Sequence, residues 1–511
     1  MVHPAALVAA GGFVWAVKNV AEKRKRNPRG LPTPPGPRGL PVLGNLLQLP
    51  QAEQWKVYSE WSREYGDMVY VDVMGQPILV LGSLEITEDL MEKHATMYSD
   101  RPTLPIGQFI DLSNSFAMMN YGAEWRHDRR VFHQYLNQHA VTQYHPIIEE
   151  EVSNLLRRLT EKPEDFRERI RFALGSIIMR VAYGFDDVET NKALVSDAER
   201  LVSAFNEAIV PGRYLVNSFP SLGGIPDWFP GAGFKERFRE LDRLNLYMLS
   251  SPFESAKKNL KEGRRSAHPN MATDLIDKLQ EENTPSWIGR ESSARNVCGL
   301  AYLTGADTTV SSAWALVFAL ATHPGVQKKA QEELDLVVGN DRLPQVSDRE
   351  NLPYIAAIVK EVSRWHSVVP LGLARASAED SEYNGYFIPK GTYLMMNTWA
   401  FMHDPAVFEK PMDFIPERYL KDGKINAAVR DPESGAFGYG RRICPGRHLS
   451  NDAIFLLAAS LLAVYHISPP KDESGKPIAM QFTPSSDVVS TPLPYQCEFS
   501  PRSEKHAALF M

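Results

Sequence analysis

The chain has 511 residues, of which 43% are hydrophobic and 23% charged, and this ordinary globular composition is enough for a large core. Its formal net charge of −6 excludes a nucleic-acid-binding protein that relies on overall positive charge. Length alone suggests about three domains. The sequence shows no internal repeat and no long Gly/Ser linker after residue 50, so one large domain also remains open.

The N-terminus carries an apolar run, 5–17, followed by the basic cluster 23–26. The run is shorter than the roughly 20 apolar residues that span a bilayer as a helix. A short membrane anchor, a helix lying in the membrane interface and a signal peptide all remain open. Because the positive charges follow the run instead of preceding it, the pattern favours a membrane anchor over 1–22 with its C-terminal side in the cytosol.

Residues 23–45 are first basic and then rich in proline, from Pro32 to Pro41. Proline fixes φ and restricts the residue before it, so this segment is predicted to be stiff and extended. It could be a hinge that holds a folded domain near a membrane, or a plain linker. We expect the folded domain itself to span 46–511.

The rest of the chain alternates between helix-like and strand-like patterns. Apolar residues at every third or fourth position predict helices, and short alternating runs predict strands. In chain order we expect a hairpin of strands at 68–73 and 77–81, helices from 120 to 265 with breaks at 210–213 and 219–230, helices from 289 to 365, short strands at 386–388 and 392–396, an apolar helix at 447–464, and a β tail at 480–500. This order predicts a mainly α, helix-rich α+β fold with small sheets.

In the first of these helical stretches, Trp125 and Arg129 are four positions apart and share one helix face. That face offers an indole N–H and a guanidinium, which together suit a carboxylate. An exposed basic helix with one core tryptophan is the alternative.

An aspartate followed by a threonine interrupts the apolar helix expected at 297–320. Burying Asp307 is costly unless it has a partner or a chemical task. Thr308 can hydrogen-bond back to the carbonyl four residues earlier, and Gly305 would let a ligand approach the helix. An acid beside an alcohol suits a proton relay, whereas a satisfied polar notch in a core helix is the alternative.

Glu361 and Arg364 are three positions apart, so they share a helix face and can pair. Such pairs are common on protein surfaces and carry little information alone. This pair gains meaning from Arg418 later in the chain, which could join it in a buried network.

The three cysteines, Cys298, Cys444 and Cys497, are too sparse for a disulfide framework or a zinc site and favour a reducing environment. Cys298 and Cys497 are interpreted as small buried hydrophobes. Cys444 differs, because two glycines before it predict a tight turn and an apolar helix follows it.

The position of Cys444 favours a thiolate. We expect it at the start of the apolar helix, with Pro445 in the first turn. Unsatisfied N–H groups and the positive end of the helix dipole both stabilise a negative sulfur there. Gly446 would let a flat, bulky group approach the backbone, and Arg442 suits a carboxylate.

Together and in this order, these motifs resemble the cytochrome P450 family of haem-thiolate monooxygenases, from the proline-rich segment to the β tail. The family's cysteine-loop pattern, which is highly specific, matches Phe437, Gly440, Arg442, Cys444 and Gly446. The family's Glu-x-x-Arg pair matches Glu361 and Arg364, with Arg418 as the third member. The oxygen-activation motif matches Gly305, Asp307 and Thr308. It departs at Thr304, where the family has alanine or glycine, and this difference concerns the shape of the local groove and not the chemistry.

The resemblance implies a single large P450 fold with haem b between the oxygen-activation helix and the cysteine loop. Cys444 would be the thiolate ligand of the iron. Asp307 and Thr308 would guide protons to dioxygen, while Glu361, Arg364 and Arg418 would be structural. The residues that would contact the haem are Trp125, Arg129, Arg375, Phe437, Arg442 and Gly446, with the tryptophan and the three arginines at the propionates.

The resemblance also implies a protein of the endoplasmic reticulum membrane with a cytosolic catalytic domain, similar to microsomal fungal members. Electrons would come from a separate NADPH-cytochrome P450 reductase, since no flavin or nicotinamide domain is present here. A basic helix face could dock this reductase or could be solvated decoration. It consists of Arg126, Arg129, Arg130 and His133.

The implied activity is insertion of one oxygen atom from O2 into a small lipophilic molecule, in secondary metabolism. The residues that the resemblance places around the substrate pocket are mostly apolar, and they are 106–116, 205–210, Tyr302, 369–373 and 488–489. Two other functions remain. One is an oxygen-independent haem-thiolate isomerase or dehydratase, against which Asp307 and Thr308 argue. The other is a non-catalytic haem carrier or sensor.

Overall fold

The computed structural model describes residues 24–209, 214–280 and 290–510, so the predicted anchor at 1–22 and the predicted break at 210–213 lie outside the described residues. The chain forms two compact units. The first contains the residues up to Pro102 together with Leu373–Asn397, and the second contains Thr103–Gly372 and the chain from Thr398 onward. Within the described ranges, no helix combines the length and the apolar character needed to cross a membrane.

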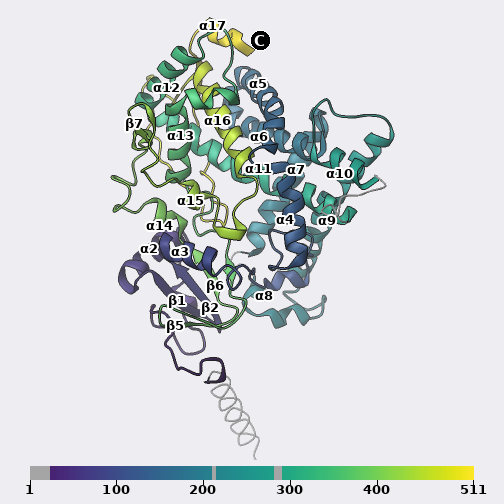
Figure 1. The fold of residues 1–511 in the computed structure, drawn as a ribbon, viewed down its shortest axis with the longest axis vertical. Coiled ribbons are helices and arrows are strands. Elements are labelled where there is room, and N and C mark those ends of the chain that lie inside the picture. Colours follow the sequence, from purple (N-terminus) through teal and green to yellow (C-terminus); the bar gives the residue numbers. More distant parts are fainter. Residues whose placement is uncertain (1–23, 210–213, 281–289, 511) are drawn as a thin grey trace, which may run out of the picture. The chain divides into compact units, whose positions relative to one another are not determined.

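The first unit is built on a four-stranded sheet with the strand order β1-β2-β6-β3 (Figure 1). Its strands are β1 (Met68–Val73), β2 (Gln76–Leu81), β6 (Tyr393–Met396) and β3 (Arg375–Ala376). β1 and β2 form the predicted antiparallel hairpin, in which Gly75 takes a left-handed φ of 89° at the turn. β2 then pairs with β6 in parallel. The unit also contains α2 (Gln54–Tyr65), α3 (Leu84–Glu88) and the small hairpin of β4 (Ser381–Tyr383) and β5 (Tyr386–Ile388).

The proline-rich segment is bonded to this first unit. The Tyr70 N–H donates to the Pro35 carbonyl at 2.8 Å, and the Phe387 N–H donates to the Pro32 carbonyl at 2.8 Å. A Cβ at Gly36 would lie 2.0 Å from the Tyr70 carbonyl oxygen, so only glycine allows this close approach. The described part of the segment therefore packs against strands and is not a free linker. The predicted boundaries, with an anchor that ends at residue 22 and a hinge that ends at residue 45, stay predictions.

The second unit is mostly helical, as the apolar periodicity predicts (Figure 1). Its helices are α4 (Ala123–Leu136), α5 (His145–Glu161), α6 (Phe166–Tyr183), α7 (Val188–Ile209), α8 (Leu215–Ser218), α9 (Gly233–Lys261), α10 (Met271–Gln280), α11 (Glu291–Thr322), α12 (Pro324–Val337), α13 (Pro353–Trp365), α14 (Thr398–Met402), α15 (Glu433–Ala436), α16 (Arg447–Val464) and α17 (Glu504–Ala507). Two small antiparallel sheets complete it, one of β7 (Leu420–Lys421) with β8 (Lys424–Ile425) and one of β9 (Tyr465–Ser468) with β10 (Glu498–Pro501).

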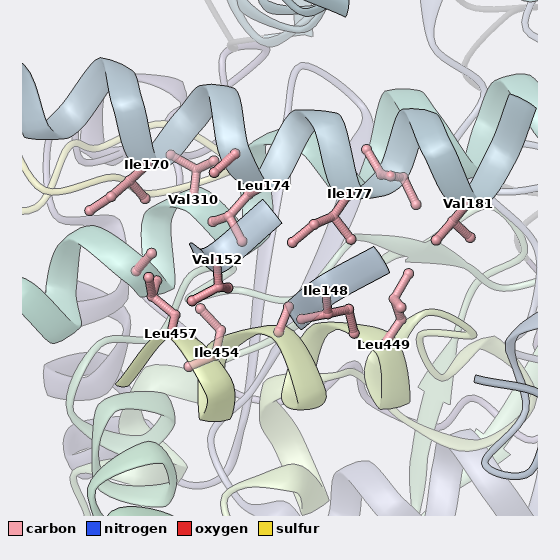
Figure 2. Close-up of a cluster of buried hydrophobic side chains, with 14 of the residues drawn as sticks. Ile148, Val152, Ile170, Leu174, Ile177, Val181, Val310, Leu449, Ile454 and Leu457 are labelled. Carbon is pink, nitrogen blue, oxygen red and sulfur yellow. The ribbon is translucent and has the colours of Figure 1, made fainter. Parts of the chain in front are cut away.

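Four helices, α5, α6, α11 and α16, pack together in the core of the second unit. Figure 2 shows one side of α6 facing residues of α5 and α16, with Val310 of α11 in the same cluster. The four α6 residues labelled in Figure 2, Ile170, Leu174, Ile177 and Val181, recur every three or four positions and so line the face towards α5 and α16. α16 is buried along nearly its whole length, which explains why its sequence is almost continuously apolar.

The predicted β tail is only partly correct. Between 480 and 500, the structure has one strand, β10, which begins at Glu498, and an isolated bridge between Pro484 and Pro492. Proline has no N–H to contribute to a strand ladder, so a segment with three prolines between 484 and 494 cannot form a continuous strand. The apolar residues that suggested strands, such as Phe482 and Tyr495, instead pack against the core from an irregular backbone.

Candidate active site

The cysteine loop is a closed turn before α16. The Cys444 N–H donates to the Phe437 carbonyl at 2.7 Å, which joins the two ends of the loop. Gly438 and Gly440 take φ values of 78° and 50°, as the predicted tight turn requires. Phe437, expected at the haem, therefore also holds the cysteine through its backbone.

The helix after the cysteine has the predicted bounds, but the proline before it does not lie in its first turn. α16 begins at Arg447 with Gly446 as its N-cap, so Pro445 lies outside the first turn. The sulfur of Cys444 still lies at the helix N-terminus. Burial raises the pKa of its thiol above the usual value, while the N–H groups of Gly446 and Arg447 and the charge of Arg129 oppose that rise.

Arg129 faces the cysteine loop and not solvent. Its guanidinium donates to the carbonyl of Ile443, next to Cys444. Burial lowers its pKa to about 10, which leaves it positively charged at neutral pH. Arg126, Arg130 and His133 are exposed, so the predicted basic face has three solvent-facing members and Arg129 is not one of them.

Trp125 and Arg442 lie together beside this loop. The Arg442 guanidinium lies 4.6 Å from the centre of the Trp125 ring and donates to the carbonyls of Phe116 at 3.0 Å and Met119 at 2.6 Å. The indole N–H of Trp125 is buried and has no acceptor among the described residues. A donor left in this state needs a partner from outside the protein chain.

On α11, Asp307 has a partner that the sequence did not reveal. Arg171 of α6 donates to its carboxylate at 2.7 Å. The same guanidinium reaches Glu199 of α7 at 3.1 Å and lies 4.9 Å from the ring centre of Trp314, seven positions after Asp307 on α11. Burial raises the pKa of the Asp307 carboxyl, Arg171 opposes the rise, and Glu199 adds to it.

The neighbours of Asp307 agree with the predicted helix distortion but correct the role of one glycine. Thr308 Oγ1 donates back to the Thr304 carbonyl at 3.1 Å, and Thr304 Oγ1 donates to the Leu300 carbonyl at 2.7 Å. A Cβ at Gly305 would lie 3.1 Å from a side-chain carbon of Ile178 on α6. Gly305 therefore permits close packing of two helices, and the expectation that its open side faces a ligand is wrong.

A hydroxyl pair joins the helix of the Asp307–Thr308 step to α16, the helix that follows the cysteine. Thr309 Oγ1 lies 3.1 Å from Ser450 Oγ, and the Ser450 N–H donates to the Gly446 carbonyl at 3.1 Å. Ser450 is thus one helical turn after the loop that carries Cys444. The structure brings the two motifs into one site within the second unit.

The predicted Glu361 network is present, with Glu361 and Arg364 fully buried and Arg418 at its edge. Arg364 makes two hydrogen bonds of 2.8 Å to the Glu361 carboxylate, and Arg418 lies 3.1 Å from it. Arg364 also donates to the carbonyls of Met402, Pro411 and Asp413. The network ties α13 to the irregular segment that leads to the cysteine loop, and this is a structural role.

Two further predicted residues belong to different units. Arg375 is buried on β3 of the first unit, and its role at a propionate stays a prediction. In the second unit, the hydroxyl of Tyr302 donates to the Leu194 carbonyl of α7, so Tyr302 packs between helices in the core. The other predicted pocket residues include the buried Ile106, Ile110 and Phe116 and the half-buried Val488 and Val489.

The second unit's residues fit a haem. A propionate would satisfy the buried indole N–H of Trp125, beside the guanidinium of Arg442. A Cβ at Gly446 would meet nothing closer than the Cys444 sulfur at 4.0 Å, so there is space for a flat group next to the sulfur. A thiol at a helix N-terminus, facing Arg129, is a suitable ligand for iron.

Known proteins resemble the chain over nearly all of its length. The family model for cytochrome P450 matches residues 34–499. The chain is 54% identical to cytochrome P450 monooxygenase COX1 of Coprinopsis cinerea, with 98% of each protein covered. It is 42% identical to COX2 of the same fungus, over 98% of this chain and 94% of that protein. It is 38% identical to cytochrome P450 monooxygenase claR of Ampulloclitocybe clavipes, over 92% of this chain and 86% of that protein.

These matches confirm the predicted helix-rich fold with small sheets and the resemblance to fungal enzymes. The region that matches the family model contains the whole cysteine loop, the Glu361 network and the Asp307–Thr308 step. The chain therefore belongs to the cytochrome P450 family and is a monooxygenase of that family.

Proposed function

We propose that this monooxygenase uses O2 and electrons from an NADPH-cytochrome P450 reductase to hydroxylate, or otherwise oxidise, a small lipophilic molecule in fungal secondary metabolism. The single observation that carries the proposal is the contact of Thr309 with Ser450, because it places the Asp307–Thr308 step beside the helix that follows Cys444. The similarity to fungal monooxygenases supports the reaction class and the lineage.

Haem b held by Cys444 would supply the oxygen activation, and thiolate ligation favours O–O cleavage. Trp125 and Arg442 would bind a propionate through the indole N–H and the guanidinium. Arg129 and the N–H groups of Gly446 and Arg447 would favour the ionised sulfur. Phe437 would keep the cysteine in place through its carbonyl.

Asp307 and Thr308 would move protons between solvent and the reacting oxygen. The carboxylate is held by Arg171, which in turn contacts Glu199, a half-exposed residue on α7. This gives the acid a fixed position and a charged route towards the surface. The hydroxyl of Thr308 now donates within its own helix, and it can turn towards a ligand by rotation about χ1.

The membrane and reductase partners follow from the sequence and from charge. We propose that residues 1–22 anchor the protein in the endoplasmic reticulum membrane with its catalytic part in the cytosol. The exposed Arg126, Arg130 and His133 on α4 would attract an acidic reductase surface. A variant that begins at Leu31 should remain in the supernatant after membranes are sedimented, and undiminished sedimentation would contradict the anchor.

The deciding experiment is expression of the full chain with a fungal reductase in a yeast host, followed by metabolite profiling. A lipophilic product with one added oxygen, formed with consumption of NADPH and O2, is expected. The matched control is Cys444→Ser, which should form none. Product formation without O2 consumption would favour an isomerase or dehydratase, and haem binding without turnover on a broad panel would favour a carrier.

A further inference from the structure

Three segments of the second unit meet at one buried polar cluster that the oxygen chemistry does not use. The cluster consists of Ser311 on α11, His366 directly after α13, and Ser490 in the tail. All three are buried, with exposed fractions of 0%, 3% and 1%. We call it the tail clasp.

In the tail clasp, His366 donates a hydrogen bond to Ser311, and Ser311 donates one to Ser490. Ser311 Oγ lies 2.7 Å from the Ser490 carbonyl and 2.8 Å from His366 Nε2. A carbonyl only accepts, so the single hydroxyl proton of Ser311 goes to Ser490. Ser311 Oγ then accepts from Nε2–H of His366, which fixes the proton of the imidazole on Nε2.

His366 is held as a neutral donor by its surroundings. Burial lowers its pKa to about 4, and its ring lies edge-on to Phe482 with the ring centres 5.3 Å apart. The backbone N–H of His366 donates to the Val362 carbonyl at 2.9 Å, which continues the hydrogen-bond pattern of α13 by one residue. The imidazole therefore has one fixed position and one task, which is to bond Ser311.

The tail clasp closes a loop whose tip carries two valines. Besides bonding Ser311, Ser490 donates from its N–H to the Val368 carbonyl at 2.8 Å and from Oγ to the Ser485 carbonyl at 2.7 Å. The Ser485 N–H donates to the Thr491 carbonyl at 2.8 Å, which joins the two ends of the 485–491 loop. The half-buried Val488 and Val489 lie between these ends.

The clasp holds this loop close to the candidate proton relay. Ser311 follows Thr308 by three positions, so their side chains lie on the same side of α11, about 4.5 Å apart along its axis. Because Ser490 is bonded to α11 one turn after Thr308, a shift of the loop at Ser490 would move Val488 and Val489 relative to the Asp307–Thr308 step. Hydrogen bonds to a buried carbonyl resist such a shift more than apolar contacts do, because a shift leaves the carbonyl unsatisfied.

We propose that Ser311 and His366 are positioning residues for specificity, which hold the 485–491 loop so that Val488 and Val489 select lipophilic ligands by shape. The proposal rests on the proposed haem-thiolate function, since it places the selected ligand beside the Asp307–Thr308 step. Neither residue touches the reacting atoms in this scheme. Their effect is on which ligands fit and not on proton transfer.

The test compares two nitrogen ligands of haem iron, imidazole and the larger 4-phenylimidazole, by Soret titration of the full-length haem-loaded protein. Loss of the clasp in Ser311→Ala or His366→Phe should change the ratio of their two dissociation constants about five-fold, with the imidazole constant nearly unchanged. His366→Gln keeps an N–H donor at the place of Nε2 and should restore the ratio. Ser176→Ala, which removes a buried hydroxyl from α6, should leave it unchanged.

A second measurement does not depend on haem. Hydrogen exchange of peptides that cover 485–491 should become about ten-fold faster in Ser311→Ala, while peptides of α5 keep their rates. An unchanged ratio and unchanged exchange in a folded Ser311→Ala protein would overturn the proposal, and so would an equal change in Ser176→Ala. If the unsubstituted protein showed no Soret shift with imidazole, the haem-thiolate function would fail and this proposal with it.

Discussion

The carboxylate of Asp307 accepts a 2.7 Å hydrogen bond from Arg171, although the two residues are 136 positions apart and lie on different helices. The ion pair explains how an aspartate can be half-buried in an otherwise apolar helix. It also leaves the acid between two opposing influences, since Arg171 lowers its pKa while burial and Glu199 raise it. The pKa of Asp307 is therefore sensitive to single substitutions around it.

Replacing Arg171 should shift the pH dependence of oxygenation upward. In Arg171→Gln the pKa of Asp307 rises further, because an opposing charge is lost, and the ionised carboxylate forms only at higher pH. The acidic limb of product formation should therefore move to higher pH. Glu199→Gln is the matched control of opposite sign, since it removes a charge that raises the same pKa. If the acidic limb of the pH profile has the same position in both variants and in the unsubstituted protein, Asp307 does not act as a proton relay.

Replacing Thr308 should separate electron consumption from product formation. Without its hydroxyl, proton delivery fails and reducing equivalents leave as hydrogen peroxide. Product per NADPH should fall by about ten-fold or more in Thr308→Ala, while NADPH consumption continues. Thr308→Ser keeps the hydroxyl and should retain most of the yield. Equal yields in the alanine variant and the unsubstituted protein would remove Thr308 from the mechanism.

Only one of the three cysteines should control the haem spectrum. Cys444→Ser should lose the red-shifted Soret band of the carbon-monoxide complex that is typical of a thiolate ligand. Cys298→Ser and Cys497→Ser should keep it, because both thiols are buried, and burial raises the pKa of Cys497 to about 12. Loss of the band in either control instead of Cys444→Ser would overturn the ligand assignment.

Breaking the Glu361 network should destabilise the second unit strongly. Glu361→Gln leaves the guanidiniums of Arg364 and Arg418 buried without a counter-charge, which costs about 3–5 kcal/mol. Urea denaturation followed by tryptophan fluorescence measures this loss. Asp341→Asn removes a comparable partner from Lys505 at a largely exposed pair and should cost less than about 1 kcal/mol. Similar losses in both would show that burial of the network is unimportant.

The buried His366 should make stability depend on pH below neutrality. Its pKa is about 4 in the folded chain and near 6.5 when unfolded, so the unfolded chain binds more protons between these values. Stability therefore rises with pH across this window and is lost as pH falls from 6.5 to 4, by about 3 kcal/mol. His366→Gln should reduce the slope of melting temperature against pH in this range. An unchanged slope would mean that His366 does not titrate on unfolding.

Local sequence patterns determined much of this protein. The hairpin around Gly75, the apolar helix that became α16, the pairing of Glu361 with Arg364 and the back-bonding of Thr308 all depend on residues a few positions apart. Strand alternation and helical periodicity bring such residues together in almost any context, so the sequence is enough to predict them. The motif order then indicated the family.

Tertiary packing alone decided the partners across the fold. Arg171 has no sequence relation to Asp307, although an arginine beside the apolar face of α6 was a possible signal. The fit of Gly305 against Ile178 and the bonding of Ser490 to Ser311 likewise required the approach of distant segments. Which buried groups meet depends on how whole helices pack, and each meeting must satisfy polar atoms that the local pattern leaves open. The sequence was thus enough to name the candidate site residues, whereas the charged groups around Asp307 became known only from the tertiary structure.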